Sequence, residues 1–309
     1  MINKIIRAIM HPSHLALFLL HKTARLWPDK LFLEIKFRLM MGQKLDLNNP
    51  KTFNEKLQWL KLYNRRVEYT TLVDKYAVKK YVSDKIGEQY IIPTLGVWNS
   101  VEDIDWDVLP NQFVLKTTHG GGGGGVVICK DKTMFDKESA KMKLQKSLDS
   151  DIYLNYREWP YKDVPKRIIA EQYMIDESFI ELKDYKFFSF DGKVKCFKVD
   201  FDRFINHKAN YYDRDAKLLP FGEICCMPDF NRIFERPKNF EKMIEIVETL
   251  SRNIPFVRVD LYNVNGKIYF GEMTFYPAAG MGKFEPDEWD LKLGKFITLP
   301  TYKSLDAYS

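Results

Sequence analysis

The stretch FVRVDLYNVNGKIYFGEMT, residues 256–274, has the pattern of two apolar strands joined by a tight turn. Asn265-Gly266 is a dipeptide favoured at the centre of a β-hairpin turn. Three charged residues interrupt the apolar strands: Arg258, Asp260 and Glu272. Because a buried charge is costly unless it is paired or bound to a metal, we expect this hairpin to carry a functional site.

The register of the hairpin decides whether its two carboxylates can share one metal ion. A two-residue turn would place Asp260 and Glu272 on opposite faces of the sheet. A three-residue loop 264–266, or a bulge, would place them on one face, with Arg258 opposite Glu272. Mg²⁺ prefers oxygen ligands and shares them with nucleotide phosphates, so a metal site predicts an odd-length loop. A structural Arg258–Glu272 ion pair explains the same charges about as well.

A run of six glycines follows a lysine upstream of this hairpin. Lys116 lies in an expected strand, 113–118, and the run leads into a second strand at 126–130. Glycine lets backbone amides approach a phosphate, and a lysine adds a point charge. The run therefore favours a loop that covers a ligand over a hairpin tip without one. Its members are Gly120, Gly121, Gly122, Gly123, Gly124 and Gly125.

Three other nucleotide-binding motifs do not fit this segment. Gly120, Gly122 and Gly125 spell G-x-G-x-x-G, but a dinucleotide fold requires a helix where residues 126–128 predict a strand. A P-loop requires G-K-[ST] at the start of a helix. A protein kinase places its lysine after the glycine loop, whereas Lys116 precedes it.

The rest of the chain predicts an α+β protein built from antiparallel hairpins. Residues 184–190 and 193–201 form a second expected hairpin around Asp191-Gly192. Buried strands are expected at 90–93 and 167–174, and helices at 1–47 (interrupted at Trp27-Pro28-Asp29), 74–86, 133–149 and 239–252. Thr52 and Glu55 form a capping box before an apolar helical pattern.

Composition limits the class of protein further. The chain has 309 residues, 45% of them hydrophobic, and four cysteines without C-x-x-C spacing, which indicates reduced thiols in a cytoplasmic enzyme rather than a disulfide framework or zinc site. Residues 1–50 hold eight Lys or Arg against three acids, 8 − 3 = +5 of the net charge of +6. This basic segment could contact the inner leaflet of a membrane. Ordinary packed helices with solvated lysines are the simpler interpretation.

Some classes of protein are not predicted. The apolar run 15–20 is too short to span a bilayer and lacks a convincing cleavage site, so we expect no signal peptide. Outside the N-terminal helices the sequence has no stripe of basic and aromatic residues, so nucleic-acid binding is not favoured.

Taken in order, these segments resemble the ATP-grasp superfamily. The resemblance rests on Lys116 with its glycines, on AEQYM at 170–174, and on Arg258-x-Asp260 followed by Glu272-x-Thr274. The TupA-like group of capsule and teichuronopeptide biosynthesis is more similar still. NPKTFNEK at 49–56, DKYAV at 74–78, FVLK at 113–116 and DYKFF at 184–188 carry that similarity over roughly residues 40–300.

The resemblance implies an ATP-grasp fold of two α+β lobes that clasp ATP, with a helical N-terminal extension. It divides the chain into a helical segment 1–70, a leading helix and strand 71–110, a small lobe 111–175 and a large lobe 176–309. It also implies these roles for individual residues. Lys75 and Lys116 would hold the ATP phosphates under the glycine lid. Glu171, Tyr173 and Met174 would bind adenine, and Asp184 the ribose. Asp260, Glu272 and Thr274 would hold Mg²⁺, although Thr274 replaces a more usual asparagine. Arg258 would stabilise charge on the substrate carboxylate.

The activity implied is ATP-dependent ligation of a carboxylate to an amine through an acyl phosphate. The substrate would be an amino acid or a bacterial surface saccharide, with Lys186, Asp200 and Arg203 as contacts unless they lie on a solvated strand edge. His119 is either a phosphate contact or a local hydrogen-bonding residue. A glycosyltransferase, suggested by D-x-D at Asp103, Asp105 and Asp213, and a nucleotide-binding scaffold without turnover remain alternatives. The sequence leaves the acceptor and the oligomeric state open.

Overall fold

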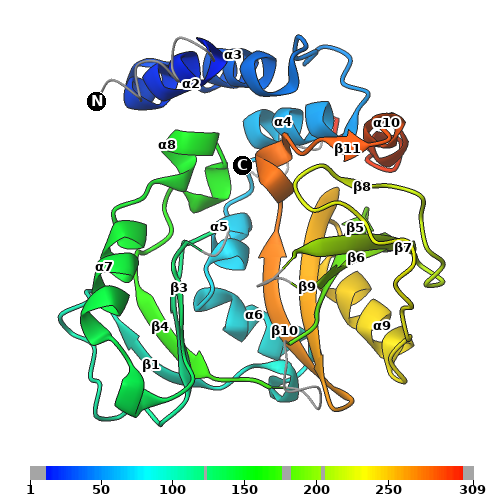
Figure 1. The fold of residues 1–309 in the computed structure, drawn as a ribbon. Coiled ribbons are helices and arrows are strands. Elements are labelled where there is room, and N and C mark those ends of the chain that lie inside the picture. The colour runs from blue at the N-terminus through cyan, green and yellow to red at the C-terminus, as the bar shows by residue number, and fades with distance from the viewer. Residues whose placement is uncertain (1–11, 122–123, 176–181, 203–205, 302–309) are drawn as a thin grey trace.

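The computed structural model describes residues 12–121, 124–175, 182–202 and 206–301. Two lobes, each built on an antiparallel sheet, lie side by side, and a layer of helices crosses one end of both (Figure 1). The expected α+β class is confirmed. Arg203, Gly122 and Gly123 lie outside the described residues. Within the described residues, the helices are too short or too polar for any of them to cross a bilayer.

The smaller lobe carries a four-stranded sheet with strand order β1-β4-β2-β3. Its strands are β1 (Thr94–Trp98), β2 (Phe113–Thr117), β3 (Val126–Cys129) and β4 (Ile168–Gln172). Helix α7 (Lys137–Leu148) packs on β2 and β3, and closes a separate core around Phe113 and Leu144. The strand expected at 90–93 is wrong: a 3₁₀ turn, η2 (Glu88–Tyr90), lies there and β1 starts after Pro93, which has no amide to donate to a sheet.

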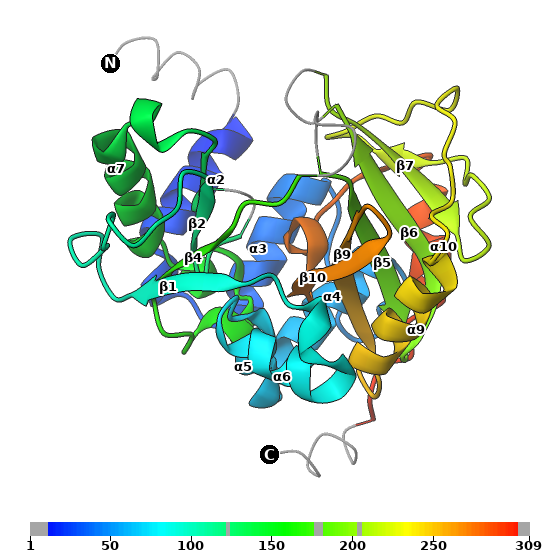
Figure 2. The ribbon, with the colours of Figure 1, turned by 90° about the horizontal axis from the view of Figure 1, so that it is seen from below.

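The larger lobe carries a five-stranded sheet with strand order β10-β9-β5-β6-β7. The strands are β5 (Asp184–Phe190), β6 (Lys193–Phe201), β7 (Lys208–Asp213), β9 (Phe256–Val264) and β10 (Lys267–Thr274). Helix α9 (Phe240–Leu250) covers one face of this sheet (Figure 2). Phe187 and Phe197 pack on Phe240 of α9. Because side chains alternate along a strand, their neighbours Lys186 and Lys198 lie on the opposite face of the sheet.

Both expected hairpins are confirmed, and their turns have the predicted chemistry. Asp191 and Gly192 have φ of 48° and 74°, and Asn265 and Gly266 have φ of 53° and 82°. Positive φ at both central residues defines the turn whose twist matches the strands.

The register of the β9–β10 hairpin corrects one expectation. The turn has two residues rather than three, because Val264 pairs with Lys267. A bulge between Phe270 and Glu272 restores the parity, so Glu272 lies directly opposite Asp260 on the same face. Arg258 consequently faces Thr274 rather than Glu272. Gly271 permits the bulge, since a Cβ there would lie 3.0 Å from the carbonyl oxygen of Asp260.

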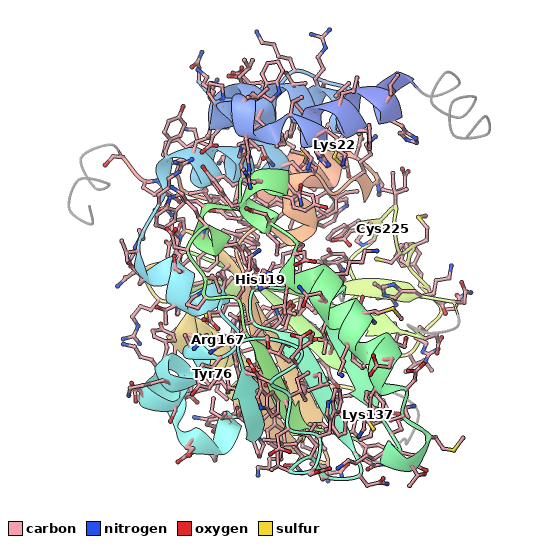
Figure 3. All side chains as sticks on the ribbon, turned by 90° about the vertical axis from the view of Figure 1, so that its left-hand side faces the viewer. Lys22, Tyr76, His119, Lys137, Arg167 and Cys225 are labelled. Carbon is pink, nitrogen blue, oxygen red and sulfur yellow. The ribbon has the colours of Figure 1, made fainter. Side chains whose placement is uncertain are left out.

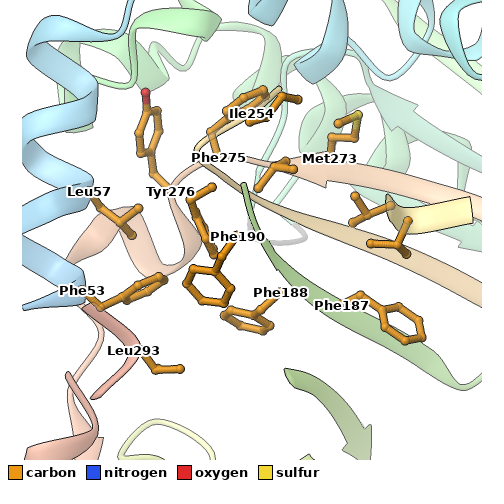
Figure 4. Packing of buried hydrophobic residues seen from close by; sticks show 14 of the residues in the cluster. Phe53, Leu57, Phe187, Phe188, Phe190, Ile254, Met273, Phe275, Tyr276 and Leu293 are labelled. Carbon is orange, nitrogen blue, oxygen red and sulfur yellow. The ribbon is translucent and has the colours of Figure 1, made fainter. Parts of the chain in front are cut away.

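Helices from the N-terminal part of the chain hold the two lobes together. Thr52 and Glu55 form the expected capping box at the start of α4. Phe53 and Leu57 of α4 then pack on Phe188, Phe190 and Tyr276 of the larger lobe (Figure 4). The helices of this part are α2 (Pro12–Lys22), η1 (Ala24–Leu26), α3 (Asp29–Met41), α4 (Phe53–Tyr63), α5 (Glu68–Val73) and α6 (Ala77–Ile86).

Short elements complete the two lobes. They are η3 (Lys132–Met134), α8 (Ile152–Tyr156), η4 (Trp159–Tyr161), η5 (Pro277–Gly280), α10 (Glu288–Gly294), and the paired strands β8 (Gly222–Glu223) and β11 (Phe284–Glu285).

Candidate active site

Arg258 lies at the centre of the charged face of the larger sheet. Its guanidinium donates to both carboxylate oxygens of Asp260, at 2.6 and 2.7 Å, and to Glu272 Oε1 at 3.1 Å. The planar fork of arginine suits two-point contact with a carboxylate. Arg258 Nη2, which contacts Glu272, also lies 3.1 Å from Thr274 Oγ1. The three residues expected to hold Mg²⁺ therefore surround one cation.

Lys186 continues the row of charges on β5, the central strand of the sheet. Its ammonium contacts Asp184, and lies 3.3 Å from Asp200 and 3.4 Å from Asp260. Lys186 and Asp200 are buried, so the alternative of a solvated strand edge is wrong for both. Asp184, expected to bind ribose, forms part of the same cluster.

Lys75 connects the two lobes through their charged groups. Its ammonium donates to the carbonyl oxygen of Gly120 at 2.6 Å, and lies 3.2 Å from Glu272 Oε2. Its backbone amide donates to Thr118 of the small lobe. One lysine therefore joins the base of the glycine loop to an acid of the β9–β10 hairpin, and its role at the phosphates stays a prediction.

Lys116 and Glu171 face each other on adjacent strands of the small sheet. Lys116 Nζ lies 2.6 Å from Glu171 Oε2, and Lys79 Nζ, on α6, contacts the other oxygen of the same carboxylate at 2.5 Å. Sequence reasoning missed Lys79. The available signal was its spacing of four residues from Lys75 within the expected helix 74–86, although α6 begins at Ala77 and Lys75 lies in the turn before it.

Opposite charges set the protonation states of these groups. Partial burial would by itself raise the pKa of Glu272, but Lys75, Arg258 and Lys186 lower it to about 2. Burial opposes ionisation of Glu171 as well, yet Lys116 and Lys79 lower its pKa. Burial would lower the pKa of Lys116, and Glu171, Glu272 and Asp184 raise it. The charge of Lys116 therefore acts on the acids of the larger lobe.

The first and last glycines of the loop are packed rather than open. A Cβ at Gly120 would lie 2.3 Å from Thr117 Oγ1, and one at Gly125 would lie 2.2 Å from the same atom. That hydroxyl is hydrogen-bonded to Ser147 Oγ at 2.8 Å. A Cβ at Gly121 or Gly124 would meet only ordinary contacts.

The other predicted residues lie around this centre. His119 is buried and its Nε2 lies 3.1 Å from the carbonyl oxygen of Ser147, so it forms a local hydrogen bond, the simpler of its two expected roles. Tyr173 and Met174 follow β4 and are half-buried. Their contact with adenine stays a prediction.

The carboxylates of Asp260 and Glu272 supply the kind of oxygen ligand that a hard divalent cation prefers. They lie opposite each other on neighbouring strands, and three cationic side chains, Arg258, Lys186 and Lys75, now balance their charge. Each of the four carboxylate oxygens contacts one of these cations, so Mg²⁺ at this pair stays a prediction and would have to displace them.

A second polar cluster lies beyond Asp200, at β7 and β8. Ligand atoms of Asp200, His207 and Cys226 lie within 4.8 Å of one another, as do those of Glu223, Cys225 and Cys226. Figure 3 labels Cys225 in this region. Lys198 Nζ already lies 3.0 Å from Glu223 and 3.9 Å from Asp200, so the carboxylates have a cationic partner without a metal.

The D-x-D sequences form local turns. Asp105 Oδ1 accepts hydrogen bonds from the amides of Asp107 and Val108, and Asp213 Oδ1 from those of Asp215 and Lys217. Backbone capping of this kind gives Asp105 and Asp213 a structural role, which weakens the glycosyltransferase alternative that their D-x-D spacing suggested.

Comparison with solved structures finds similar chains at low sequence identity. D-alanine–D-alanine ligase from Bacillus anthracis has 17% identity and a TM-score of 0.41 over 80% of this chain and 74% of its own. The enzyme of the same name from Helicobacter pylori has 13% identity and a TM-score of 0.43 over 84% and 70%. The ATP-grasp ligase PsnB, in a complex with minimal precursor, Mg and ADP, has 9% identity and a TM-score of 0.37 over 80% and 62%.

Comparison with curated proteins finds no match. Comparison with family models finds one that covers most of the chain. The model described as TupA-like ATPgrasp matches residues 55–298, a span that contains Lys75, the described glycines, Glu171 and the whole β9–β10 hairpin. The chain belongs to the TupA-like ATP-grasp family.

Proposed function

We propose that the chain is an ATP-dependent carboxylate–amine ligase that joins an amino acid to a uronic-acid or amino-sugar unit of a bacterial surface polysaccharide. ATP-grasp family membership supports the ligase class. The observation that carries the proposal is the convergence of Lys75, Gly120, Glu272, Arg258 and Asp260 in one chain of contacts across both lobes.

The charges of the site suit a triphosphate and a carboxylate. Lys75 and Lys116 bring positive charge from the small-lobe side, where Lys75 already touches the base of the glycine loop. Arg258 offers a planar fork to a substrate carboxylate or to the acyl phosphate formed from it. Mg²⁺ held by Asp260 and Glu272 would neutralise phosphate charge during phosphoryl transfer.

In this proposal the glycine loop shields the acyl phosphate from water. Gly120 and Gly125 are buried and anchor the two ends of the loop, while Gly121 and Gly124 are exposed. A reactive acyl phosphate survives only if water is kept away until the amine attacks. The anchored ends and open middle of the loop are consistent with that function.

ADP release is the direct test. The purified protein is given ATP, Mg²⁺ and pairs of amino acids with uronic acids or amino sugars, and products are identified by mass spectrometry. We expect one pair to yield stoichiometric ADP and an amide product, and Arg258→Ala to remove both. ATP binding without ADP release for every acceptor would favour a non-catalytic scaffold.

A further inference from the structure

Helix α2 turns an apolar face outward. Leu15, Phe18, Leu19 and Lys22 share one side of the helix at the spacing i, i+3, i+4, i+7. Phe18 is 56% exposed and Leu19 is 53% exposed. Leu20, on the opposite side, is buried in the core of the protein. The helix therefore docks through one side and leaves large apolar side chains on the other.

The stretch of sequence that contains this face carries positive charge and no acid. Lys22 holds its ammonium 5.8 Å from the centre of the Phe18 ring, and Figure 3 labels it on the outer helical layer. The next turn adds the exposed Arg25 and Leu26, the latter 80% exposed. Residues 12–28 contain two cationic and no acidic side chains, and residues 1–11 add Lys4 and Arg7, again without an acid.

An apolar stripe within a stretch, residues 1–28, that holds cations and no acid suits a partner surface that is both apolar and negatively charged. A second protein copy would oppose like charge with like charge across such a face. We propose that the exposed face of α2, with Lys22 and Arg25, docks the protein on an anionic phospholipid bilayer. Leu15, Phe18 and Leu19 enter the headgroup boundary, and the two cations contact lipid phosphates.

The outer position of α2 agrees with this arrangement. The helix belongs to the layer at one end of the two lobes, and the turn of the β9–β10 hairpin lies at the opposite end (Figure 1). Docking through α2 would hold the enzyme at the membrane without covering the charged face of the larger sheet. The inference does not depend on the ligase reaction.

Vesicle flotation of the full chain tests the proposal. We expect binding to vesicles of mixed phosphatidylcholine and phosphatidylglycerol at low salt, weaker binding at high salt, and little binding to phosphatidylcholine alone. Phe18→Gln with Leu19→Gln should lower binding about tenfold or more, because the apolar anchors are lost while glutamine keeps the helix. Lys22→Glu with Arg25→Glu should lower it at least roughly 30-fold, about fivefold for each cation removed.

Matched variants distinguish the face from general surface properties. Met134→Gln with Met142→Gln removes apolar side chains that are 84% and 69% exposed on the small lobe. Lys143→Glu with Lys146→Glu reverses two exposed charges on α7. Both controls should bind as the parent does, and ADP release in solution should be unchanged in all four variants.

Several results would overturn the proposal. Equal binding to neutral vesicles, no binding to anionic ones, or unaltered binding of the α2 variants would each exclude an anionic bilayer as the partner. A parent protein that sediments as a dimer, and becomes monomeric with Phe18→Gln and Leu19→Gln, would assign the face to a second copy of the chain.

Discussion

Replacing Asp260 by asparagine distinguishes the contribution of the active-site acids to folding stability from their contribution to the reaction. Asp260 is 3% exposed and Arg258 is 12% exposed, and they share two hydrogen bonds. Removing one partner of a buried pair costs about 3–5 kcal/mol of unfolding free energy. The lower end applies here, because Arg258 keeps Glu272 and Lys186 keeps Asp184 and Asp200.

This cost converts into a measurable shift of the melting temperature. With an unfolding entropy of roughly 2.1 cal/mol/K per residue over 309 residues, a loss of about 3 kcal/mol lowers Tm by about 5 °C. Glu272→Gln should cost under about 1 kcal/mol, or roughly 1.5 °C, because the Glu272 side chain is 36% exposed and solvent screens its pairs. Both variants should lose ADP release.

Differential scanning fluorimetry and a coupled ADP assay measure the two effects on the same samples. Asp84→Asn is the control, since it removes an exposed pair with Lys80 and should leave both readouts unchanged. The reasoning fails if Asp260→Asn melts with the parent protein, or if Glu272→Gln is equally destabilised. ADP release at the parental rate in either variant would refute the metal-ligand assignment.

Three further results are expected. Lys79→Gln should raise KM for ATP, because Glu171 then keeps Lys116 but loses its contact with Lys79. Lys116→Gln should raise KM and also lower kcat. Kinetics equal to those of the parent for both variants would contradict this. Gly125→Ala should cost about 1–3 kcal/mol of unfolding free energy, because its Cβ would displace the hydroxyl of Thr117, whereas Gly124→Ala should stay within about 0.5 kcal/mol in the same chemical denaturation series. Glu223 has its pKa lowered to about 2, since Lys198 and Tyr211 outweigh the effect of burial, so its stabilisation is complete above the unfolded pKa and is lost as pH falls from about 4.5 towards 2. Glu223→Gln should flatten that acid limb of the stability profile, and an unchanged slope would show that other groups cause it.

The hairpins and helix caps could be predicted because their signals are local. Asn265-Gly266 and Asp191-Gly192 fix their own backbone geometry, and Thr52 and Glu55 satisfy neighbouring amides. The outer charge of α2 is also visible in the sequence. The sequence does not show which apolar residues of α2 face outward, because in a helix that is apolar on all sides no pattern distinguishes the buried side.

The sequence by itself determined which residue types carry the chemistry: a lysine before six glycines, and an arginine and two acids inside apolar strands. Only the tertiary structure decided how these residues meet. The bulge at Gly271 restored the parity that the two-residue turn would have broken. The packing of α6 and of the turn before it brought Lys79 and Lys75 to acids in different lobes. A bulge and a long-range ion pair depend on what the neighbouring strand or helix presents, and sequence spacing along one segment does not contain that information.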